Sequence, residues 1–404
     1  MARFEPFAAI RYDSRRLRAD DVVSPPYDVV GPAERAKLAV RSPYNAIHVE
    51  LPIPDEAAGL DRYENAARIF GSWLADGGVR YDPGPGFYLY RMTFRDERDQ
   101  PRVTTGLLGA LGLDPDGTGQ VLPHEQTIPK DRNDRLSLLR STRLNTSPIW
   151  GLSLAKGLTS LCGEAAASAG ESGWRATDLA GVIHELWPVA DERTVGAIVA
   201  LAATAPVLIA DGHHRYDTAC GYAAECRASN GDMAGPHDLM LAFVVELSEE
   251  ELSIRAIHRL VSGVAAERLP GLLAPFFRVE PAGIDLAGFP PTAPVGVIGL
   301  ATRGGFSLLY PLPALEEAAE DDLDSSRLKV ALAALGDHEL TYQPGWQEAL
   351  AAVNDGAADA AFLLRPVAVS KIERVAHGGR RMPPKTTFFE PKPRTGMAFR
   401  SLGD

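Results

Sequence analysis

The segment that decides the fold runs Ala205-Pro-Val-Leu-Ile-Ala-Asp-Gly-His-His-Arg-Tyr-Asp-Thr-Ala219. Its apolar run, Val207 to Ala210, predicts a short buried strand, and a helical pattern follows at once with Tyr216 and Ala219 on one face. A strand, a tight turn and a helix start direct free backbone N–H groups and a partial positive charge at one point. The segment therefore predicts an anion site, such as a phosphate site, at the start of this helix.

Five consecutive residues at this turn have side chains or backbone properties that suit an anion. They are Asp211, Gly212, His213, His214 and Arg215. Gly212 lets the backbone take a positive φ and approach closely, and the planar fork of Arg215 can hold a phosphate or carboxylate through two bonds. Both histidines can change charge near neutral pH. The alternative interpretation is structural: Asp211 caps the helix, and the histidines are solvated residues of its first turn.

Composition indicates an ordinary globular protein, large enough for two domains. The chain has 404 residues, 45% of them hydrophobic and 23% charged, and a formal net charge of −12. An acidic chain is a poor non-specific nucleic-acid binder, so we expect no nucleic-acid partner. No apolar run reaches about 20 residues and the N-terminus lacks a signal-peptide pattern, so we expect no membrane association. Three cysteines without metal-type spacing favour a cytoplasmic location.

Alternating strand and helix patterns predict a mixed α/β or α+β architecture. Residues 45–51 alternate and read as a strand, 134–142 as a helix, 147–154 and 239–247 as strands, and 395–400 as a last strand. Near residue 265 the sequence pattern changes to short predicted strands separated by Pro- and Gly-rich connectors. We therefore expect a core at 1–265 and a C-terminal α/β region at 266–404 that packs on the core and contributes to the site.

Four further polar clusters fall on predicted loops or beside strands, where functional residues concentrate. The first ends in Tyr27-Asp28, and its alternative is a structural turn. The second holds His124 and Glu125 beside cations that include Arg135, which suits acid/base work on an anion or forms a solvated loop. The third, His258-Arg259, favours a surface or core pair over a site. The fourth, Arg380 to Thr387, contains Lys385 and Thr386 and can line a phosphate site or form a stiff surface loop.

Several enzyme classes lack their motifs in this chain. It has no G-x-x-x-x-G-K-[ST] loop, no G-x-G-x-x-G after a strand, no G-x-S-x-G elbow and no H-E-x-x-H helix. Adjacent residues on a helix point about 100° apart, so His213 and His214 reach one metal ion only across an irregular turn. A metal site is left open.

Five segments together resemble the domain-of-unknown-function 1015 family of bacteria and archaea. They are VVSPPYDVV, LPHEQTIPKDRNDRLSLLRSTRLNTSPIWGL, LIADGHHRYDTA, RAIHRLV and RRMPPKTTFFEPKPRTG. The D-G-H-H-R box also resembles the phosphate-binding box of the ParB/sulfiredoxin superfamily, which includes free-serine kinases. The resemblance implies a ParB/sulfiredoxin-like core with large elaborations. His213 replaces the sulfiredoxin cysteine, so that chemistry is not expected.

The resemblance implies roles for the candidate residues. The box, Asp211 to Arg215, would hold nucleotide phosphates, with Arg135, Lys385 and Thr386 as further contacts. An acidic residue of an N-terminal loop would act as base, and both Asp28 and Glu125 are candidates. His124, His213 and His214 complete the catalytic candidates.

We expect a nucleotide-dependent phosphotransferase that uses ATP, ADP or another nucleotide with Mg²⁺ on a small hydroxyl-bearing metabolite, with serine as the first candidate. A kinase-like enzyme or nucleotide hydrolase is favoured, and the alternative is a nucleotide- or phosphometabolite-sensing protein without catalysis. The partners are then a nucleotide and a small molecule. We also predict that Asp28, Glu125, Arg215 and Lys385 converge on one cleft, and that Arg215 faces this cleft and not the core.

Overall fold

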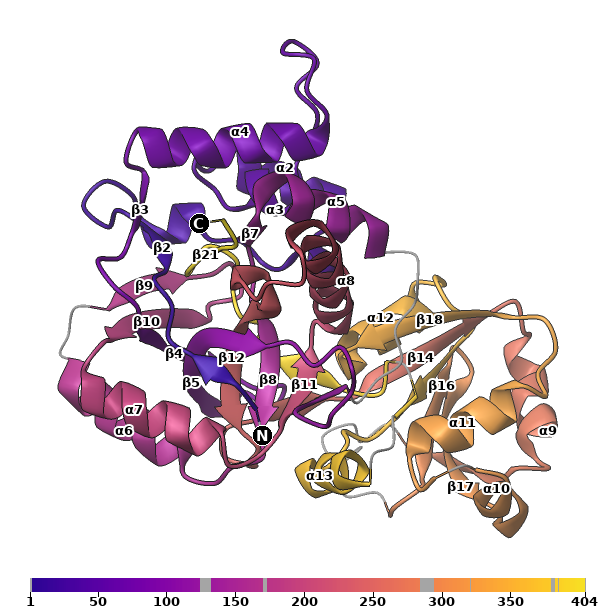
Figure 1. Ribbon diagram of the computed structural model, residues 1–404. Helices are drawn as coiled ribbons and strands as arrows, with labels where there is room; N and C mark the ends of the chain where they lie inside the picture. The colour runs from indigo at the N-terminus through magenta and orange to yellow at the C-terminus, as the bar shows by residue number, and fades with distance from the viewer. Residues whose placement is uncertain are drawn as a thin grey trace. The chain divides into compact units, whose positions relative to one another are not determined.

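The computed structural model describes residues 2–123, 132–169, 173–283, 294–319, 321–378, 382–383 and 385–403. Helices and several β-sheets alternate along the chain, which confirms the predicted mixed α and β architecture (Figure 1). Contacts between residues divide the chain into two compact units. Unit 1 comprises Met1–Leu252, Ala376–Gly379 and Pro391–Asp404, and unit 2 comprises Ser253–Val375 and Arg380–Glu390.

A nine-stranded mixed sheet forms the centre of unit 1, with strand order β6-β11-β8-β12-β5-β4-β10-β9 and β1 paired to β5 beside this path. The strand bounds are β1 Phe4–Glu5, β4 Phe87–Arg95, β5 Pro101–Gly112, β6 Val121–Pro123, β8 Ile149–Ser153, β9 Trp174–Thr177, β10 Ile183–Val189, β11 Val207–Asp211 and β12 Leu239–Glu246. β11 runs parallel to β6, and β12 runs parallel to β8; the other pairs are antiparallel. Every residue of β12 is buried, in keeping with its unbroken apolar sequence.

Helices and short paired strands complete unit 1. The helices are α1 Ala19–Val22, α2 Pro32–Ala39, α3 Ile47–Glu50, α4 Arg62–Ala75, α5 Arg132–Thr142, α6 Leu158–Ala169, α7 Glu192–Ala202 and α8 His213–Asn230, with 3₁₀ turns at Tyr27–Val29 and Pro236–Asp238. β2 (Ile10–Tyr12) pairs with β3 (Val79–Tyr81). α6 and α7 lie side by side, and α5 packs against both α4 and α8 (Figure 1). Across the described ranges, no helix has the length and apolar character needed to cross a bilayer.

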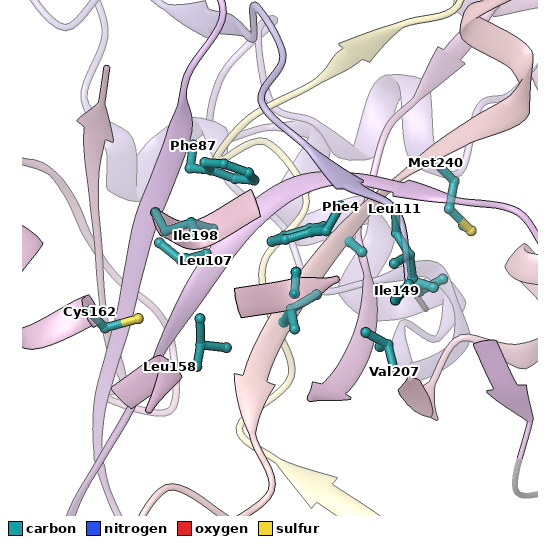
Figure 2. Close-up of a cluster of buried hydrophobic side chains, with 14 of the residues drawn as sticks. Phe4, Phe87, Leu107, Leu111, Ile149, Leu158, Cys162, Ile198, Val207 and Met240 are labelled. Atoms are coloured by element: carbon teal, nitrogen blue, oxygen red, sulfur yellow. The ribbon is translucent and has the colours of Figure 1, made fainter. Parts of the chain in front are cut away.

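The main core of unit 1 lies between the sheet and its helices (Figure 2). Phe4, Phe87 and Leu107 from the sheet meet Leu158 of α6 and Ile198 of α7 there, and all five side chains are buried. Full burial of a side chain of this size stabilises the folded state by about 1.5–3 kcal/mol. This packing fixes the sheet from which β11 presents its carboxyl end to the candidate site.

Unit 2 is built on a six-stranded antiparallel sheet with the order β15-β17-β16-β19-β14-β18. Its strands are β13 Ser253–Arg255, β14 Ile257–Ser262, β15 Phe277–Ala282, β16 Ile298–Thr302, β17 Gly305–Pro311, β18 Glu339–Pro344, β19 Ala360–Leu363 and β20 Phe388–Glu390, where β13 pairs with β20. Its helices are α9 Leu269–Leu273, α10 Pro313–Ala318, α11 Asp324–Leu332, α12 Trp346–Asn354 and α13 Val369–His377, with a 3₁₀ turn at Ala266–Arg268. A separate hydrophobic cluster that includes Phe277, Phe362 and Leu328 forms the core of this unit.

The compact units have limits that differ from the expected division at residue 265. Unit 1 ends at Leu252, and the chain returns to it at Pro391. The return has a local cause, because Thr395 and Phe399 form backbone bridges to Ser24 and Ile10. In addition, β21 (Arg400–Ser401) pairs with β7 (Leu144–Asn145). The functional assignment of 1–265 and 266–404 stays a prediction.

The strand predicted at residues 45–51 is wrong, because α3 occupies Ile47–Glu50. Asn45 causes the difference: its Oδ1 accepts the Ile47 N–H at 3.0 Å, which starts a helical turn. Its Nδ2 donates to the Asp21 carbonyl at 2.7 Å, so the side chain is fixed from both ends. The helical turn brings the Glu50 side chain inward, where it is buried.

The strand predicted at residues 395–400 is also largely wrong. Only Arg400 of this range lies in a strand, and Thr395 and Phe399 make isolated bridges. Gly396 has a φ of +92°, which breaks an extended run. The segment contacts unit 1 through isolated β-bridges and does not form a continuous strand pairing.

Candidate functional site

The junction between β11 and α8 has the strand–turn–helix form that its sequence predicts. β11 ends at Asp211, and α8 begins at His213 with Gly212 as N-cap. Gly212 has a φ of +93°, and a Cβ at this position would lie 2.8 Å from Cγ2 of Ile149. Both the backbone conformation and the space therefore require glycine. Because Gly212 has no side chain, no side-chain hydrogen bond caps the first turn of α8.

Asp211 pairs with two cations at this junction and is not the N-cap of α8. Its Oδ2 accepts a hydrogen bond from Nη2 of Arg215 at 2.9 Å, and its Oδ1 lies 2.9 Å from Nζ of Lys392. Burial alone would raise the pKa of Asp211, but the charges of Lys392 and Arg215 outweigh it and hold the pKa well below its usual range. Asp211 is therefore a carboxylate, and the interpretation of this residue as a helix cap is wrong.

Lys392 connects the box to the N-terminal loop. Its ammonium group donates to Oδ2 of Asp28 as well as binding Asp211, and its side chain is only 9% exposed. Burial would lower the pKa of Lys392, but Asp211 and Asp28 raise it above its ordinary value. Asp28 keeps 36% of its side chain exposed. One cation thus joins two carboxylates that are far apart in sequence.

Arg215 is held inside unit 1, and its place in one cleft with Glu125 and Lys385 stays a prediction. Its side chain is 11% exposed. Nη1 donates to Oγ of Ser147 at 3.1 Å and to the Pro148 carbonyl, while Nη2 donates to Asp211. Burial would lower the pKa of Arg215, but Asp211 and other nearby acidic groups raise it. The planar fork of an arginine suits this divergent set of acceptors.

Glu50 is a buried carboxylate that the sequence analysis did not identify. It accepts hydrogen bonds from Thr146 Oγ1 at 2.6 Å, from Ser147 Oγ at 3.1 Å and from the Tyr27 backbone N–H at 3.3 Å. Ser147 also accepts from Arg215, so Glu50 joins the same network. Glu50 was missed because residues 47–50 were predicted as part of a strand. That prediction gives no reason to expect a buried carboxylate at this position.

Arg135 is a second buried charged residue that contacts Glu50. Its Nη1 donates to the Glu50 carbonyl at 2.8 Å, and its Nε donates to Asp134 at 2.9 Å. Its guanidinium carbon lies 4.3 Å from the centre of the Tyr27 ring, within the range of a cation–π contact. Arg135 therefore holds the loop that carries Tyr27 and Asp28.

A cavity of about 50 Å³ lies inside this network. Polar side chains of Glu50, Arg135, Thr146, Ser147 and Arg215 line part of it. A nucleotide-sized pocket measures about 300–1,000 Å³, so this cavity is large enough only for small groups or water. The rest of its lining is partly apolar, with Leu138, Leu139, Leu144, Ala219 and Met240.

The residues predicted for the site divide into two groups. Asp28, Asp211, Gly212, Arg215 and Arg135 come together in unit 1 through Lys392, Ser147 and Glu50.

The second group comprises two residues at the start of α8, two residues of unit 2 and two residues outside the described part of the chain. His213 and His214 form the first turn of α8, where the charge of His213 helps to lower the pKa of Asp211. His124 and Glu125 lie outside the described residues. Lys385 and Thr386 belong to unit 2; Lys385 is exposed, and Thr386 is buried with Oγ1 donating to the Pro383 carbonyl at 2.7 Å. Their place in one cleft with Arg215 stays a prediction.

The sequence gives only weak indications of the site residues that the sequence analysis missed, which include Lys392, Thr146 and Ser147. Lys392 stands between two prolines, in a segment quoted for the family resemblance, but nothing local indicates that it returns to Asp211. Thr146 precedes the strand predicted at 147–154 and Ser147 is its first residue, so both look like ordinary residues at a strand start. Within the described part of the chain, no group of three or more His, Cys, Asp and Glu side chains is arranged to hold a metal ion.

The fold and the site define a mixed α+β protein with two carboxylates and two cations gathered at a glycine-capped helix start. The chain belongs to the family described as "Protein of unknown function (DUF1015)", whose model matches residues 4–331. This match confirms the family resemblance seen in the sequence. No curated protein matches the chain.

Several solved structures match this chain at low identity. A conserved hypothetical protein from Pyrococcus furiosus is 15% identical over 70% of this chain and 91% of its own, with a TM-score of 0.38. A free serine kinase in complex with AMP is 14% identical over 69% of this chain and 86% of its own, with a TM-score of 0.38. SbnI with a C-terminal truncation, from Staphylococcus aureus, is 14% identical over 71% and 85%, with a TM-score of 0.39. Values at this level say nothing about the activity of this chain.

Proposed function

We propose that unit 1 is the nucleotide-binding core of a phosphotransferase that acts on a small hydroxyl-bearing metabolite. The observation that carries the proposal is the ammonium group of Lys392, bound to both Asp28 and Asp211 beside the start of α8. Phosphoryl transfer requires positioned cations, helix N-terminal amides and a carboxylate that orients the attacking hydroxyl. These three elements occur together here.

The start of α8 is the proposed phosphate site. Its first amides have no side-chain cap, and the helix dipole favours an anion there. Lys392 and Arg215 add positive charge beside these amides. Incoming phosphate oxygens would compete with Asp28 and Asp211 for Lys392, and this exchange would release Asp28. Lys385 and Thr386 remain proposed further contacts for the nucleotide.

Asp28 is the proposed base. Its side chain is the more exposed of the two carboxylates on Lys392, so an acceptor can reach it from solvent. The hydroxyl of the acceptor would give its proton to Asp28 as its oxygen bonds to phosphorus and the nucleotide leaves. Glu125 is the alternative base, and His124, His213 and His214 remain proposed acid/base groups. Serine is the first acceptor to test, because the D-G-H-H-R box resembles that of free-serine kinases.

Asp28 and Asp211 also fit the oxygen-donor preference of Mg²⁺. This ion is usually held by one or two carboxylates plus substrate phosphates, so it needs no larger cluster of protein ligands. When bound, Mg²⁺ would neutralise charge on the phosphates. ATP and ADP are the proposed donors, and the ParB/sulfiredoxin-like assignment of the core rests on the same strand–glycine–helix junction. The acidic net charge and three free cysteines support a cytoplasmic protein that does not bind nucleic acid.

One observation favours the alternative, a nucleotide- or phosphometabolite-sensing protein without catalysis. Asp28 is paired with Lys392, so its carboxylate is already engaged by an ammonium group and must leave it before it contacts an acceptor hydroxyl. Ligand binding alone would stabilise the fold by mass action. Strong thermal stabilisation by a nucleotide without any product is the result that this alternative predicts.

Phosphorus NMR tests the proposed enzyme directly. The full chain is incubated with Mg²⁺, serine and other hydroxyl-bearing metabolites, and ATP, ADP or CTP as donor. We expect a phosphomonoester signal that depends on both the donor and the acceptor. Asp28→Asn should lower the rate by at least about 100-fold while nucleotide still stabilises the protein. Absence of a product with every donor contradicts the enzyme, and unchanged turnover in Asp28→Asn removes Asp28 from the mechanism.

A further inference from the structure

A second and larger cavity lies in unit 1, with a volume of about 230 Å³. It shares no lining residue with the 50 Å³ cavity described above. Its walls come from residues 20–29, from α2 and Arg41 shortly after it, from the turn at 178–180, and from Arg394. Drug-sized ligands occupy about 300–1,000 Å³, so a cavity of this size suits a small metabolite.

One part of the wall is apolar. Val23 and Leu38 are buried, and Pro25 also lines the cavity. Val29 and Leu179 also line the cavity and are unusually exposed for apolar side chains, with Leu179 at 70%. Exposed apolar side chains at the edge of a cavity favour a ligand with an aliphatic part.

The carboxylates that line this cavity already have compensating groups. Asp178 accepts from Arg394 Nε at 3.0 Å and lies 3.1 Å from His184 Nε2, and these groups lower its pKa against the opposing effect of burial. Asp20 accepts the Thr177 N–H at 2.7 Å. Glu34 lies in the first turn of α2, where the helix dipole stabilises a negative charge. The acidic groups therefore do not require a cationic ligand.

Two side chains that line the cavity, Arg41 and Ser24, have hydrogen-bond donors that are not used among the described residues. A guanidinium group carries five N–H donors. Among the described residues, Arg41 makes a single side-chain hydrogen bond, a long one of 3.5 Å to Oδ1 of Asp21. Ser24 is 1% exposed, and its Oγ has no partner within the described part of the chain. A buried hydroxyl without a partner is costly, and a ligand oxygen would remove that cost.

We propose that this cavity binds a small organic carboxylate with an aliphatic body. The carboxylate would accept hydrogen bonds from Arg41 and Ser24, and the aliphatic body would pack against Val23 and Leu38. Guanidinium forks match carboxylates in geometry, which favours this group over an amine or a neutral alcohol. The site is separate from the proposed phosphate site, and the inference does not depend on the proposed function.

Calorimetric titration with matched probes tests this site. Hexanoate and isovalerate are titrated into the full chain, with hexylamine and hexanol as probes of the same length and a different head group. We expect saturable binding of the carboxylates and binding at least about tenfold weaker for the amine and the alcohol. Equal binding of hexanol or hexylamine, or no saturable binding of either carboxylate, overturns the proposal.

Three variants locate the binding. Arg41→Gln should weaken hexanoate binding by at least about tenfold, because it removes a charge-assisted hydrogen bond. Ser24→Ala should weaken it by about threefold to tenfold without loss of stability, since the hydroxyl has no described partner to lose. Ala180→Phe, at an exposed lining residue, should block the cavity. Arg15→Gln is the matched control, because Arg15 is 87% exposed and does not line the cavity. Wild-type affinity in both Arg41→Gln and Ala180→Phe contradicts the assignment.

Discussion

The ammonium group of Lys392 has a structural role whether or not a nucleotide binds. It lies between the carboxylates of Asp28 and Asp211, and its own side chain is almost buried. Removing one partner of such a cluster leaves the other charges uncompensated, which costs more than the intact pair contributes. The same arrangement holds the ammonium group of Lys392 beside the proposed phosphate site.

Lys392→Met should therefore lower the free energy of unfolding by about 2–3 kcal/mol, because Asp28 and Asp211 lose their shared cation. Urea denaturation measures the change. Lys37→Met is the matched control, since Lys37 is exposed on α2 and its loss should matter by less than about 0.5 kcal/mol. If the two variants are equally stable, the ammonium group does not hold this cluster together.

Arg215 gives the second prediction at this scale. Arg215→Ala should lower the free energy of unfolding by about 2–4 kcal/mol, because Asp211, Ser147 and the Pro148 carbonyl lose a donor inside the fold. Arg215→Lys keeps the charge and should recover part of the stability. Wild-type stability of Arg215→Ala, measured by thermal unfolding, is the contrary outcome.

The turn between β11 and α8 is the element on which the site depends. Gly212→Ala should lower the free energy of unfolding by about 1–3 kcal/mol, because a Cβ meets Ile149 and the φ of +93° is strained for alanine. Gly71→Ala is a contrasting control within α4, where an added Cβ meets nothing within 4 Å. That variant should be more stable than wild type by about 0.5–1 kcal/mol, because alanine is the better helix former. Equal effects of the two substitutions would exclude a special backbone requirement at Gly212.

β14 supplies a pH-dependent element in unit 2. His258 is buried in this strand, its Nδ1 accepts the Leu364 N–H at 3.1 Å, and burial lowers its pKa from 6.5 to about 4. An unfolded histidine binds a proton near pH 6.5, whereas the folded one resists protonation until about pH 4. Stability is therefore complete above the unfolded pKa and is lost progressively as the pH falls from about 6.5 to 4, by about 3 kcal/mol.

His258→Gln provides the comparison for this pH dependence. The variant should be less stable at neutral pH, and its unfolding free energy should vary less between pH 4 and 6.5 because the titrating group is gone. Urea denaturation at a series of pH values gives both curves. Parallel curves for wild type and variant would show that His258 does not cause the dependence.

At the scale of the whole molecule, the sequence predicted the features that neighbouring residues determine. It did not predict the features that depend on contacts between distant parts of the chain. The junction at residues 207–215 follows from neighbouring residues, so its strand, glycine turn and helix were predicted and confirmed. Glu50 was missed because a single Asn45 side chain turns an alternating pattern into a helix. Lys392 was missed because its partners lie more than 180 residues away along the chain, and only the return of the tail brings them together.

We propose above all that the start of α8, together with Lys392, forms a phosphate-binding site. Calorimetric titration of ADP with Mg²⁺ into wild type, Lys392→Met and Lys37→Met tests it most directly, at a temperature where circular dichroism shows all three folded. We predict saturable binding by wild type and Lys37→Met, and affinity at least about tenfold lower for Lys392→Met. Absence of binding by the wild-type protein, or equal affinity of all three proteins, would contradict the claim.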